Sequence, residues 1–206
     1  MSKNEYPRKR FQKAEEIFRQ NYGLLRTAEA SRLGIAPATL YAMREAGVAV
    51  QENRGLYRLA EVQPPGNPDL VQVALLVPKA VICLISALSF HGLTTQIPHR
   101  VYIALPRRSQ RPRLAYPVID VIWLPELAYQ AGIETHVLDG VTVHIYGREK
   151  TLADCFRYSE RVGKDVLLEM LHEYKRQGNV NVASILHYAR IDRVVEKIQP
   201  YLEAIL

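Results

Sequence analysis

The sequence contains little cysteine, and this excludes several classes of protein. Only two cysteines occur among the 206 residues, Cys83 and Cys155, and each lies within an apolar stretch. Two such cysteines cannot provide the framework of a disulfide-rich secreted protein, and they lack the close pairing of a zinc site. We expect buried thiols in a reducing compartment, with no metal and no cofactor.

Long hydrophobic runs are also missing. Pro78 and Lys79 interrupt the most apolar stretch, residues 70–93, and leave residues 80–90. That remainder is well short of the roughly 20 apolar residues that a membrane-spanning helix needs. The opening MSKNEYPRKR has no apolar core such as a secretory signal contains. We therefore expect a cytoplasmic protein without a membrane partner.

Acidic residues are unevenly distributed along the chain. The formal net charge is +6, and no acidic residue lies between Leu70 and Ile119. Within that region the loop PRRSQRPR carries four arginines, namely Arg107, Arg108, Arg111 and Arg113. Such a loop can follow nucleic-acid phosphates, or it can be a solvated loop or a charged hairpin tip that resists aggregation. The positive charge fits a nucleic-acid partner without requiring one.

Residues 24–60 show the pattern of a helix-turn-helix. Thr27 is a suitable cap for a short helix over residues 28–33, Gly34 favours the positive φ of a tight turn, and Pro37 can open a second helix. Small and apolar residues follow the spacing that two crossing helices need, and these are Ala30, Gly34, Leu40 and Met43.

A hairpin is predicted directly after the two helices, with strands at residues 48–50 and 56–59. The combination predicts a winged helix that places its second helix in the major groove of DNA. Such domains also occur as purely structural or protein-binding modules, so this alternative stays open.

The candidate DNA contacts fall into three groups. The second helix would read bases through Thr39, Tyr41 and Arg44. The hairpin would touch the DNA backbone through Arg54 and Arg58. Arg8 and Lys9 precede these elements and belong either to an N-terminal arm that contacts phosphates or to a merely solvated first turn. Glu45 and Glu52 are discordant in this setting. An acid there can accept a hydrogen bond from cytosine, but more often it orients a neighbouring arginine.

The rest of the chain predicts an α+β domain. A proline-rich linker at residues 63–68 separates a winged domain, residues 1–62, from a mixed α+β domain, residues 69–206. We predict helices at residues 8–20, 69–76, 78–91, 148–158, 164–177, 182–189 and 194–205, and strands at residues 100–105, 116–124, 133–138 and 141–146.

Several stretches resemble the AbiEi-type antitoxins of bacterial abortive-infection systems. The winged-helix segment ends in a Gly-x-aromatic-Arg return, AVICLISALSFHGLT resembles the helix that opens the family's C-terminal domain, and VLDGVTVHIYGREKTLADCFRY resembles its hairpin and following helix. The order of these stretches over residues 8–160 carries the resemblance.

The resemblance implies a type IV antitoxin. Such a protein represses its own promoter by binding inverted repeats in double-stranded DNA, and it counteracts an AbiEii-like nucleotidyltransferase toxin without forming a stable complex with it. The implied DNA-facing residues match those above, namely Thr39, Tyr41, Arg44, Arg54 and Arg58. This sequence departs from the family in that its second helix carries a single arginine. Some members of the family act as solitary regulators, so a toxin partner does not follow from the resemblance.

Enzymatic alternatives find little support in the sequence. A two-residue turn at Asp139-Gly140 would pair His136 with Val143 and His144 with Thr135, so these two candidate metal ligands would point to opposite faces. The sequence has neither a glycine-rich phosphate loop nor an HExxH pattern. We expect no enzyme.

Asp154 and Asp120 are the carboxylates on which an enzymatic reading would depend. Thr151 and Asp154 form a capping-box-like pair, and we expect Asp154 to bond backbone or an arginine. Two rivals to the antitoxin reading remain open: an RNA- or protein-binding regulator with a structural winged helix, and a nucleic-acid-modifying enzyme that uses Asp120 or Asp154.

Overall fold

The computed structural model of the chain describes residues 6–53, 55–62, 67–114 and 116–205, without the side chains of residues 6–10 and 53. The chain divides into two compact units, the first holding residues 1–71 and 138–141 and the second residues 72–137 and 142–206. This division falls inside helix α4 (Pro68–Leu76). We predicted a linker at residues 63–68, of which 63–66 lie outside the described residues.

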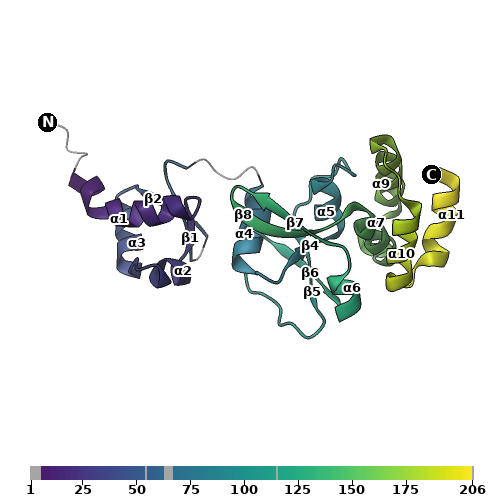
Figure 1. Cartoon of the computed structure of the whole chain (residues 1–206), viewed down its shortest axis with the longest axis horizontal. Coiled ribbons are helices and arrows are strands. Elements are labelled where there is room, and N and C mark those ends of the chain that lie inside the picture. Colours follow the sequence, from purple (N-terminus) through teal and green to yellow (C-terminus); the bar gives the residue numbers. More distant parts are fainter. Residues whose placement is uncertain (1–5, 54, 63–66, 115, 206) are drawn as a thin grey trace. The chain divides into compact units, whose positions relative to one another are not determined.

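The first unit combines three helices with a small antiparallel sheet (Figure 1). The helices are α1 (Tyr6–Gln20), α2 (Thr27–Arg32) and α3 (Pro37–Glu45), and the strands are β1 (Leu24–Arg26), β2 (Ala49–Asn53) and β3 (Leu56–Leu59) in the order β1-β3-β2. Strand β1 was not predicted, because three residues are too few to show an alternating pattern. It extends the predicted hairpin to three strands.

The core of the first unit follows the predicted apolar faces. Phe11, Ala14 and Phe18 of α1 are buried together with Leu40 and Met43 of α3. Because these side chains recur at helical spacing, each helix presents one apolar stripe to the same cluster. The position of α3 is therefore set by its buried side, which leaves its opposite side toward solvent.

The turn between α2 and α3 depends on Gly34. This glycine has φ +90°, and beyond it the amide of Ile35 donates to the carbonyl of Ala30 at 2.7 Å. The bond closes the end of α2 and turns the chain sharply into α3. Thr27, predicted as the cap of α2, is instead its first residue, and Arg26 occupies the cap position. The amide of Thr27 donates to the carbonyl of Gly55 at 2.9 Å.

The second unit is built on a mixed five-stranded sheet with the order β6-β5-β4-β8-β7. Strand β4 runs antiparallel to β5 and parallel to β8, and β5 runs parallel to β6. The strands are β4 (Val81–Ile82), β5 (Val101–Pro106), β6 (Ile119–Leu124), β7 (Ile133–Leu138) and β8 (Val141–Tyr146). The predicted strands at 133–138 and 141–146 are confirmed.

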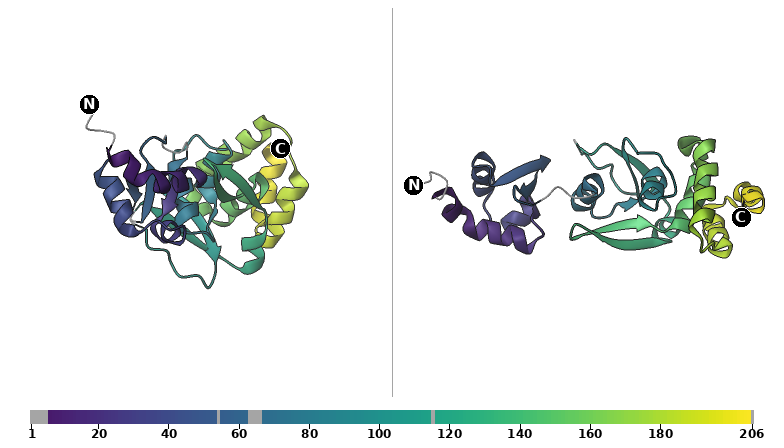
Figure 2. Two further views of the ribbon diagram at one scale, coloured as in Figure 1. Left: turned by 60° about the vertical axis from the view of Figure 1, so that its left-hand side comes forward. Right: turned by 90° about the horizontal axis from the view of Figure 1, so that it is seen from above.

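Most helices of the second unit pack around one core with this sheet. Figures 1 and 2 show α9, α10 and α11 gathered on one side of the sheet. Besides α4, the helices are α5 (Leu84–Phe90), α6 (Glu126–Gln130), α7 (Arg148–Arg157), α8 (Ser159–Val162), α9 (Lys164–Gln177), α10 (Val182–Asp192) and α11 (Val195–Ile205). The mixture of sheet and helices confirms the α+β class.

The predicted helix at residues 78–91 is partly wrong. Val81 and Ile82 form the central strand β4, and the helix α5 begins only at Leu84, whose φ is +45°. The amide of Cys83 donates to the carbonyl of Tyr102 at 3.0 Å, which is a contact with β5 rather than with a helical turn. A short strand buried between two neighbours forms a continuous apolar run, and periodicity alone cannot distinguish it from a buried helix.

No helix among the described residues is both long and apolar enough to cross a membrane.

Candidate nucleic-acid interface and a buried charge network

Helix α3 exposes one side in the first unit. Leu40 and Met43 are 1% and 0% exposed, whereas Tyr41 is 50% exposed. Arg44 is exposed as well, and Thr39 is half-buried. The face that a ligand can reach therefore carries Tyr41 and Arg44, with Thr39 only partly accessible.

Arg44 is held in place by two neighbours. Its Nη1 donates to Oε1 of Gln51 at 2.9 Å, and its guanidinium carbon lies 5.7 Å from the centre of the Tyr41 ring. Gln51 belongs to β2, so this contact joins α3 to the hairpin. An arginine whose rotamer is already restricted loses less side-chain entropy on binding.

Arg58 is placed differently from our prediction. It is only 7% exposed, its Nε lies 2.5 Å from Oε1 of Glu52, and its Nη1 donates to the carbonyls of Leu59 and Val62. The predicted DNA contact is therefore corrected to a structural role, because the guanidinium is already engaged inside the unit. Glu52, discordant in the sequence, is explained as the partner of this buried arginine.

We predict that Arg58→Leu loosens the hairpin. Glu52 loses its cation and two carbonyls lose a donor, which costs about 1–3 kcal/mol when such groups stay unpaired. Hydrogen exchange of the amides at residues 49–59 should then accelerate by about tenfold or more, since each 1.4 kcal/mol corresponds to a factor of ten. Arg44→Leu, at an exposed arginine, is the matched control. Equal protection in both variants would contradict this role.

Three of the predicted DNA contacts involve side chains that the structure does not describe. Arg54 lies outside the described residues, and so do the side chains of Arg8 and Lys9 in the first turns of α1. Their DNA contacts stay predictions.

The arginine-rich loop joins β5 to β6 in the second unit. These two strands are parallel, so the loop is a crossover connection and not the hairpin tip that we considered. Its backbone is tied to the sheet where the indole Nε1 of Trp123 donates to the carbonyl of Ser109 at 3.0 Å. All four arginines are exposed, and none forms an ion pair within the described residues; they are Arg107, Arg108, Arg111 and Arg113.

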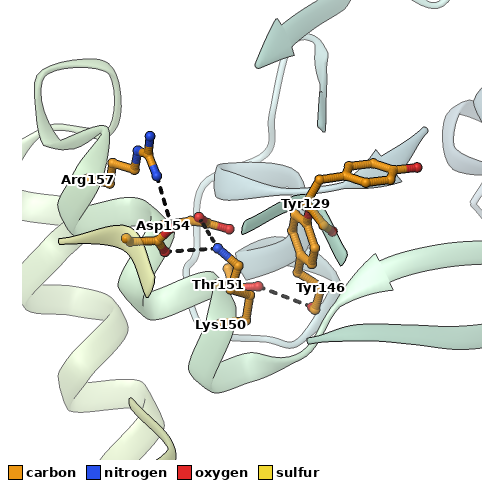
Figure 3. A network of polar contacts seen from close by, with 7 residues as sticks. Tyr129, Tyr146, Lys150, Thr151, Asp154 and Arg157 are labelled. Carbon is orange, nitrogen blue, oxygen red and sulfur yellow. Dashed lines mark hydrogen bonds and ion pairs between the residues drawn. The ribbon is translucent and has the colours of Figure 1, made fainter. Parts of the chain in front are cut away.

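A cluster of buried charges lies inside the second unit, between α7 and α10 (Figure 3). Lys150 is 0% exposed, and its Nζ lies 2.6 Å from Oδ1 of Asp154 and 2.9 Å from Oδ2 of Asp192. Arg157 donates to the other oxygen of Asp192 at 3.1 Å. The ammonium also lies 5.2 Å from the centre of the Tyr146 ring. Lys150 thus joins α7, α10 and the end of β8.

Asp154 is the least satisfied member of this cluster. Its Oδ2 has no hydrogen-bond partner within the described residues. Burial raises the pKa of Asp154 to about 7, and Asp192 adds to the rise, whereas Lys150 opposes it. This direction is physically reasonable, because Asp192 already shares the charge of Lys150 and one oxygen of Asp154 receives no donor.

The capping-box interpretation of Thr151 and Asp154 is wrong. Helix α7 starts after Gly147, so Thr151 lies in its second turn and donates to the carbonyl of Tyr146 at 3.2 Å. Within the described part of the chain, Asp154 bonds Lys150 and neither a backbone amide nor an arginine. Lys150 itself carried a usable signal, since its spacing of four residues from Asp154 is that of an ion pair on one helical face.

We predict a pH dependence of stability from Asp154. Its pKa in the folded state is about 7, above the ordinary 3.8, so at intermediate pH the folded chain holds a proton that the unfolded chain has released. The resulting stability is complete below pH ~4 and is lost as the pH rises through ~7. The unfolding free energy of the native chain minus that of Asp154→Asn should therefore fall between these pH values. If the two unfolding free energies change with pH in parallel, Asp154 is not the titrating group.

The other side chains considered as metal ligands or catalytic groups have separate partners in the structure. His136 Nε2 lies 3.2 Å from Glu134 Oε2, whereas His144 Nδ1 lies 3.4 Å from the hydroxyl of Thr135, the residue with which we predicted it to pair. Asp120 contacts two arginines, Arg100 and Arg161. No group of three His, Cys, Asp or Glu side chains in the described part of the chain is placed to hold a metal ion.

The two cysteines are buried and unpaired, as predicted. Burial raises the pKa of both thiols well above its ordinary value.

Two comparisons with known proteins found similarities, one to a segment of the first unit and one to the fold of most of the chain. Residues 12–60 match the sequence profile of a family described as "Transcriptional regulator, AbiEi antitoxin". This segment is similar to the AbiEi antitoxin family of transcriptional regulators. The resemblance found in the sequence is thereby confirmed for residues 12–60, which contain α2, α3 and the hairpin.

The second finding concerns the fold alone. The crystal structure of the RV2827C protein from Mycobacterium tuberculosis is similar with a TM-score of 0.60 at 15% sequence identity, over 86% of this chain and 70% of that one. No curated protein sequence matches the chain.

Proposed function

We propose that the chain is a DNA-binding transcriptional regulator whose first unit is a winged helix. Helices α2 and α3 form the helix-turn-helix, with α3 in the major groove, and β2 and β3 form the wing. The AbiEi regulator match over residues 12–60 supports this assignment. The observation that carries it is the exposed face of α3, where Arg44 is already oriented by Tyr41 and Gln51.

The contacts divide into base readout and backbone positioning. Arg44 and Tyr41 read base edges with Thr39 beside them, because a bidentate arginine distinguishes guanine from the other bases. Arg54, Arg8 and Lys9 contact phosphates and hold the register. Arg58 supports the wing from within and does not contact DNA.

The regulator acts as the antitoxin of a type IV toxin–antitoxin system. It represses its own operon at inverted repeats and counteracts an AbiEii-like nucleotidyltransferase toxin in the cytoplasm without a stable complex. The AbiEi antitoxin match over residues 12–60 supports this role. In this proposal the second unit, which lies outside that match, supplies the antitoxic activity. The chain itself is not an enzyme.

The first test is binding of the full chain to its own upstream DNA, against a scrambled duplex, over a salt series. A specific complex that persists near physiological salt is the expected result, since base contacts add to the salt-dependent phosphate term. Weak and equal binding to both duplexes that disappears with salt would contradict the regulator. Stronger binding to RNA at matched salt would favour an RNA-binding module instead.

The arginine-rich loop adds phosphate contacts to this complex. Its four arginines are exposed, and the loop backbone is anchored to the sheet at Ser109 by the bond from Trp123. Replacing all four by glutamine should reduce the slope of log K against log salt concentration by up to about 3.6, because each neutralised phosphate contributes roughly 0.9 to that slope. A matched control replaces four exposed basic residues outside the loop by glutamine, at Lys164, Lys175, Arg190 and Arg193. An unchanged slope in the arginine variant would remove the loop from the interface.

A further inference from the structure

A cleft in the second unit is lined by both apolar and basic side chains. It has a volume of about 690 Å³ and lies where α5 and the segment between α5 and β5 meet the start of β5. Ile85, Ile97 and Tyr102 provide apolar and aromatic surface, and His99 and Arg100 provide polar groups. This combination is typical of a small-molecule site, where apolar walls hold the body of a ligand and a few polar groups fix its orientation.

The wall of the cleft is fixed by hydrogen bonds to a carboxylate. Both oxygens of Glu169 on α9 are engaged by the segment, since Oε2 accepts from the hydroxyl of Thr94 at 2.8 Å and Oε1 from the amide of Thr95 at 2.6 Å. Burial raises the pKa of Glu169, but the bonds from Thr95 and Thr94 outweigh it and lower the pKa. The segment is therefore ordered before any ligand arrives, which reduces the entropy lost on binding.

The floor of the cleft is tied to α5 by a buried hydroxyl. Ser86, only 3% exposed, accepts from the amide of Tyr102 at 2.9 Å. Tyr102 also packs against the core of the second unit. Its ring thus offers a fixed surface for a planar ligand group, as aromatic side chains do when bases stack on them.

Arg100, which lines the cleft, belongs to a cluster of two arginines and one aspartate. Asp120 lies between two arginines: Arg161 Nη1 is 3.1 Å from Oδ1, and Arg100 Nη1 is 3.7 Å from Oδ2. Two cations share one carboxylate, and the longer distance leaves Arg100 loosely engaged. Both arginines are half-exposed, with 51% of each side chain accessible, so a second anion can reach them. Arginine is suited to phosphate because its planar donors bind two oxygens at once.

We propose that this cleft binds a nucleotide. Arg100 holds the phosphate with Arg161 beside it, and Tyr102 and Ile97 cover the base. The site lies wholly in the second unit and is separate from the DNA-reading face of α3. The same chemistry is offered by a free nucleotide and by an unpaired nucleotide of a single strand, and the experiment below distinguishes these two sources.

Calorimetric titration of the full chain with AMP, inorganic phosphate and adenosine tests the proposal. AMP should bind more tightly than either part, because the cleft engages base and phosphate together. Arg100→Gln should weaken AMP binding by about tenfold, as expected for one charge-assisted contact. Arg190→Gln, at an exposed arginine of α10 outside the cleft, is the matched control and should bind AMP normally.

Two further variants separate a built site from general charge attraction. Asp120→Asn should strengthen AMP binding, since it removes the anion that competes for both arginines. Glu203→Gln, at an exposed acid outside the cleft, removes an equal charge and should have no effect. Ile97→Ser, at a side chain that is 84% exposed, should weaken AMP but not inorganic phosphate.

The outcomes are decisive in either direction. Tighter, Arg100-dependent binding of a single-stranded hexanucleotide than of AMP identifies a strand as the ligand, and the reverse identifies a free nucleotide. The proposal is overturned if AMP does not bind at millimolar concentration, if phosphate binds as well as AMP, or if Arg190→Gln weakens binding as much as Arg100→Gln. Circular dichroism of each variant verifies that the fold is kept.

Discussion

Lys150→Met is expected to destabilise the second unit by about 3–5 kcal/mol, the cost of removing one partner from a buried ion pair. Lys150 is fully buried and is the common partner of two carboxylates. Methionine fills much of the same volume but offers neither charge nor donors. Asp192 keeps Arg157, whereas Asp154 has no second cation among the residues that the structure describes. The loss should grow with pH, because Asp154 can avoid its unpaired charge only while it stays protonated.

The fluorescence of Trp123 allows this prediction to be measured in the second unit alone. It is the only tryptophan in the sequence and lies on β6. Urea titrations monitored at this residue give the unfolding free energies of the native chain and of Lys150→Met. Lys164→Met, at an exposed lysine of α9, controls for loss of a lysine and should change stability by less than about 0.5 kcal/mol.

A double variant tests whether the cost comes from the abandoned carboxylate. Lys150→Met combined with Asp154→Leu removes both charges of the closest pair, while Asp192 still has Arg157. It should be more stable than Lys150→Met alone, since an apolar pair of similar volume often replaces a buried ion pair at little cost. If the unfolding free energy of Lys150→Met lies within about 1 kcal/mol of the native value, the cluster is not needed for stability.

Arg44→Ala is expected to weaken binding to the operator by roughly 5- to 150-fold, the effect of losing about 1–3 kcal/mol of base discrimination. Binding to a scrambled duplex should fall much less, because a single phosphate-neutralising charge is all that this complex loses. The geometry supports the assignment: the guanidinium is exposed on α3, bonded to Gln51 and close to Tyr41.

Fluorescence anisotropy with both duplexes at one salt concentration measures this difference. Gln51→Ala should lower operator affinity by a smaller factor, since it removes the group that orients Arg44 but keeps the charge. Arg190→Ala, an exposed arginine of the second unit, controls for charge alone. If Arg44→Ala weakens operator and scrambled DNA equally, Arg44 contacts phosphate and base readout lies elsewhere.

Local sequence signals were sufficient for much of the fold. Gly34, Pro37 and the buried Leu40 and Met43 specify the turn and the exposed side of α3, because caps, turns and amphipathic periods act over a few residues. The helix at 164–177 and the strands at 133–138 and 141–146 were predicted at the observed residues for the same reason. The AbiEi resemblance rested on the order of such local stretches.

The sequence by itself determined the two-helix turn, the α+β class, the acid-free region and which residues of α3 face solvent. Only the tertiary structure decided the rest. Val81 and Ile82 became a central strand because β5 and β8 flank them, Arg58 was buried by its bond to Glu52, and Lys150 met Asp192 from 42 residues away. Arg100 and Arg161 likewise share Asp120 only because the residue before β5, strand β6 and α8 come together. Buried strands and shared charges depend on partners distant in sequence, and no local pattern encodes which distant residue will arrive.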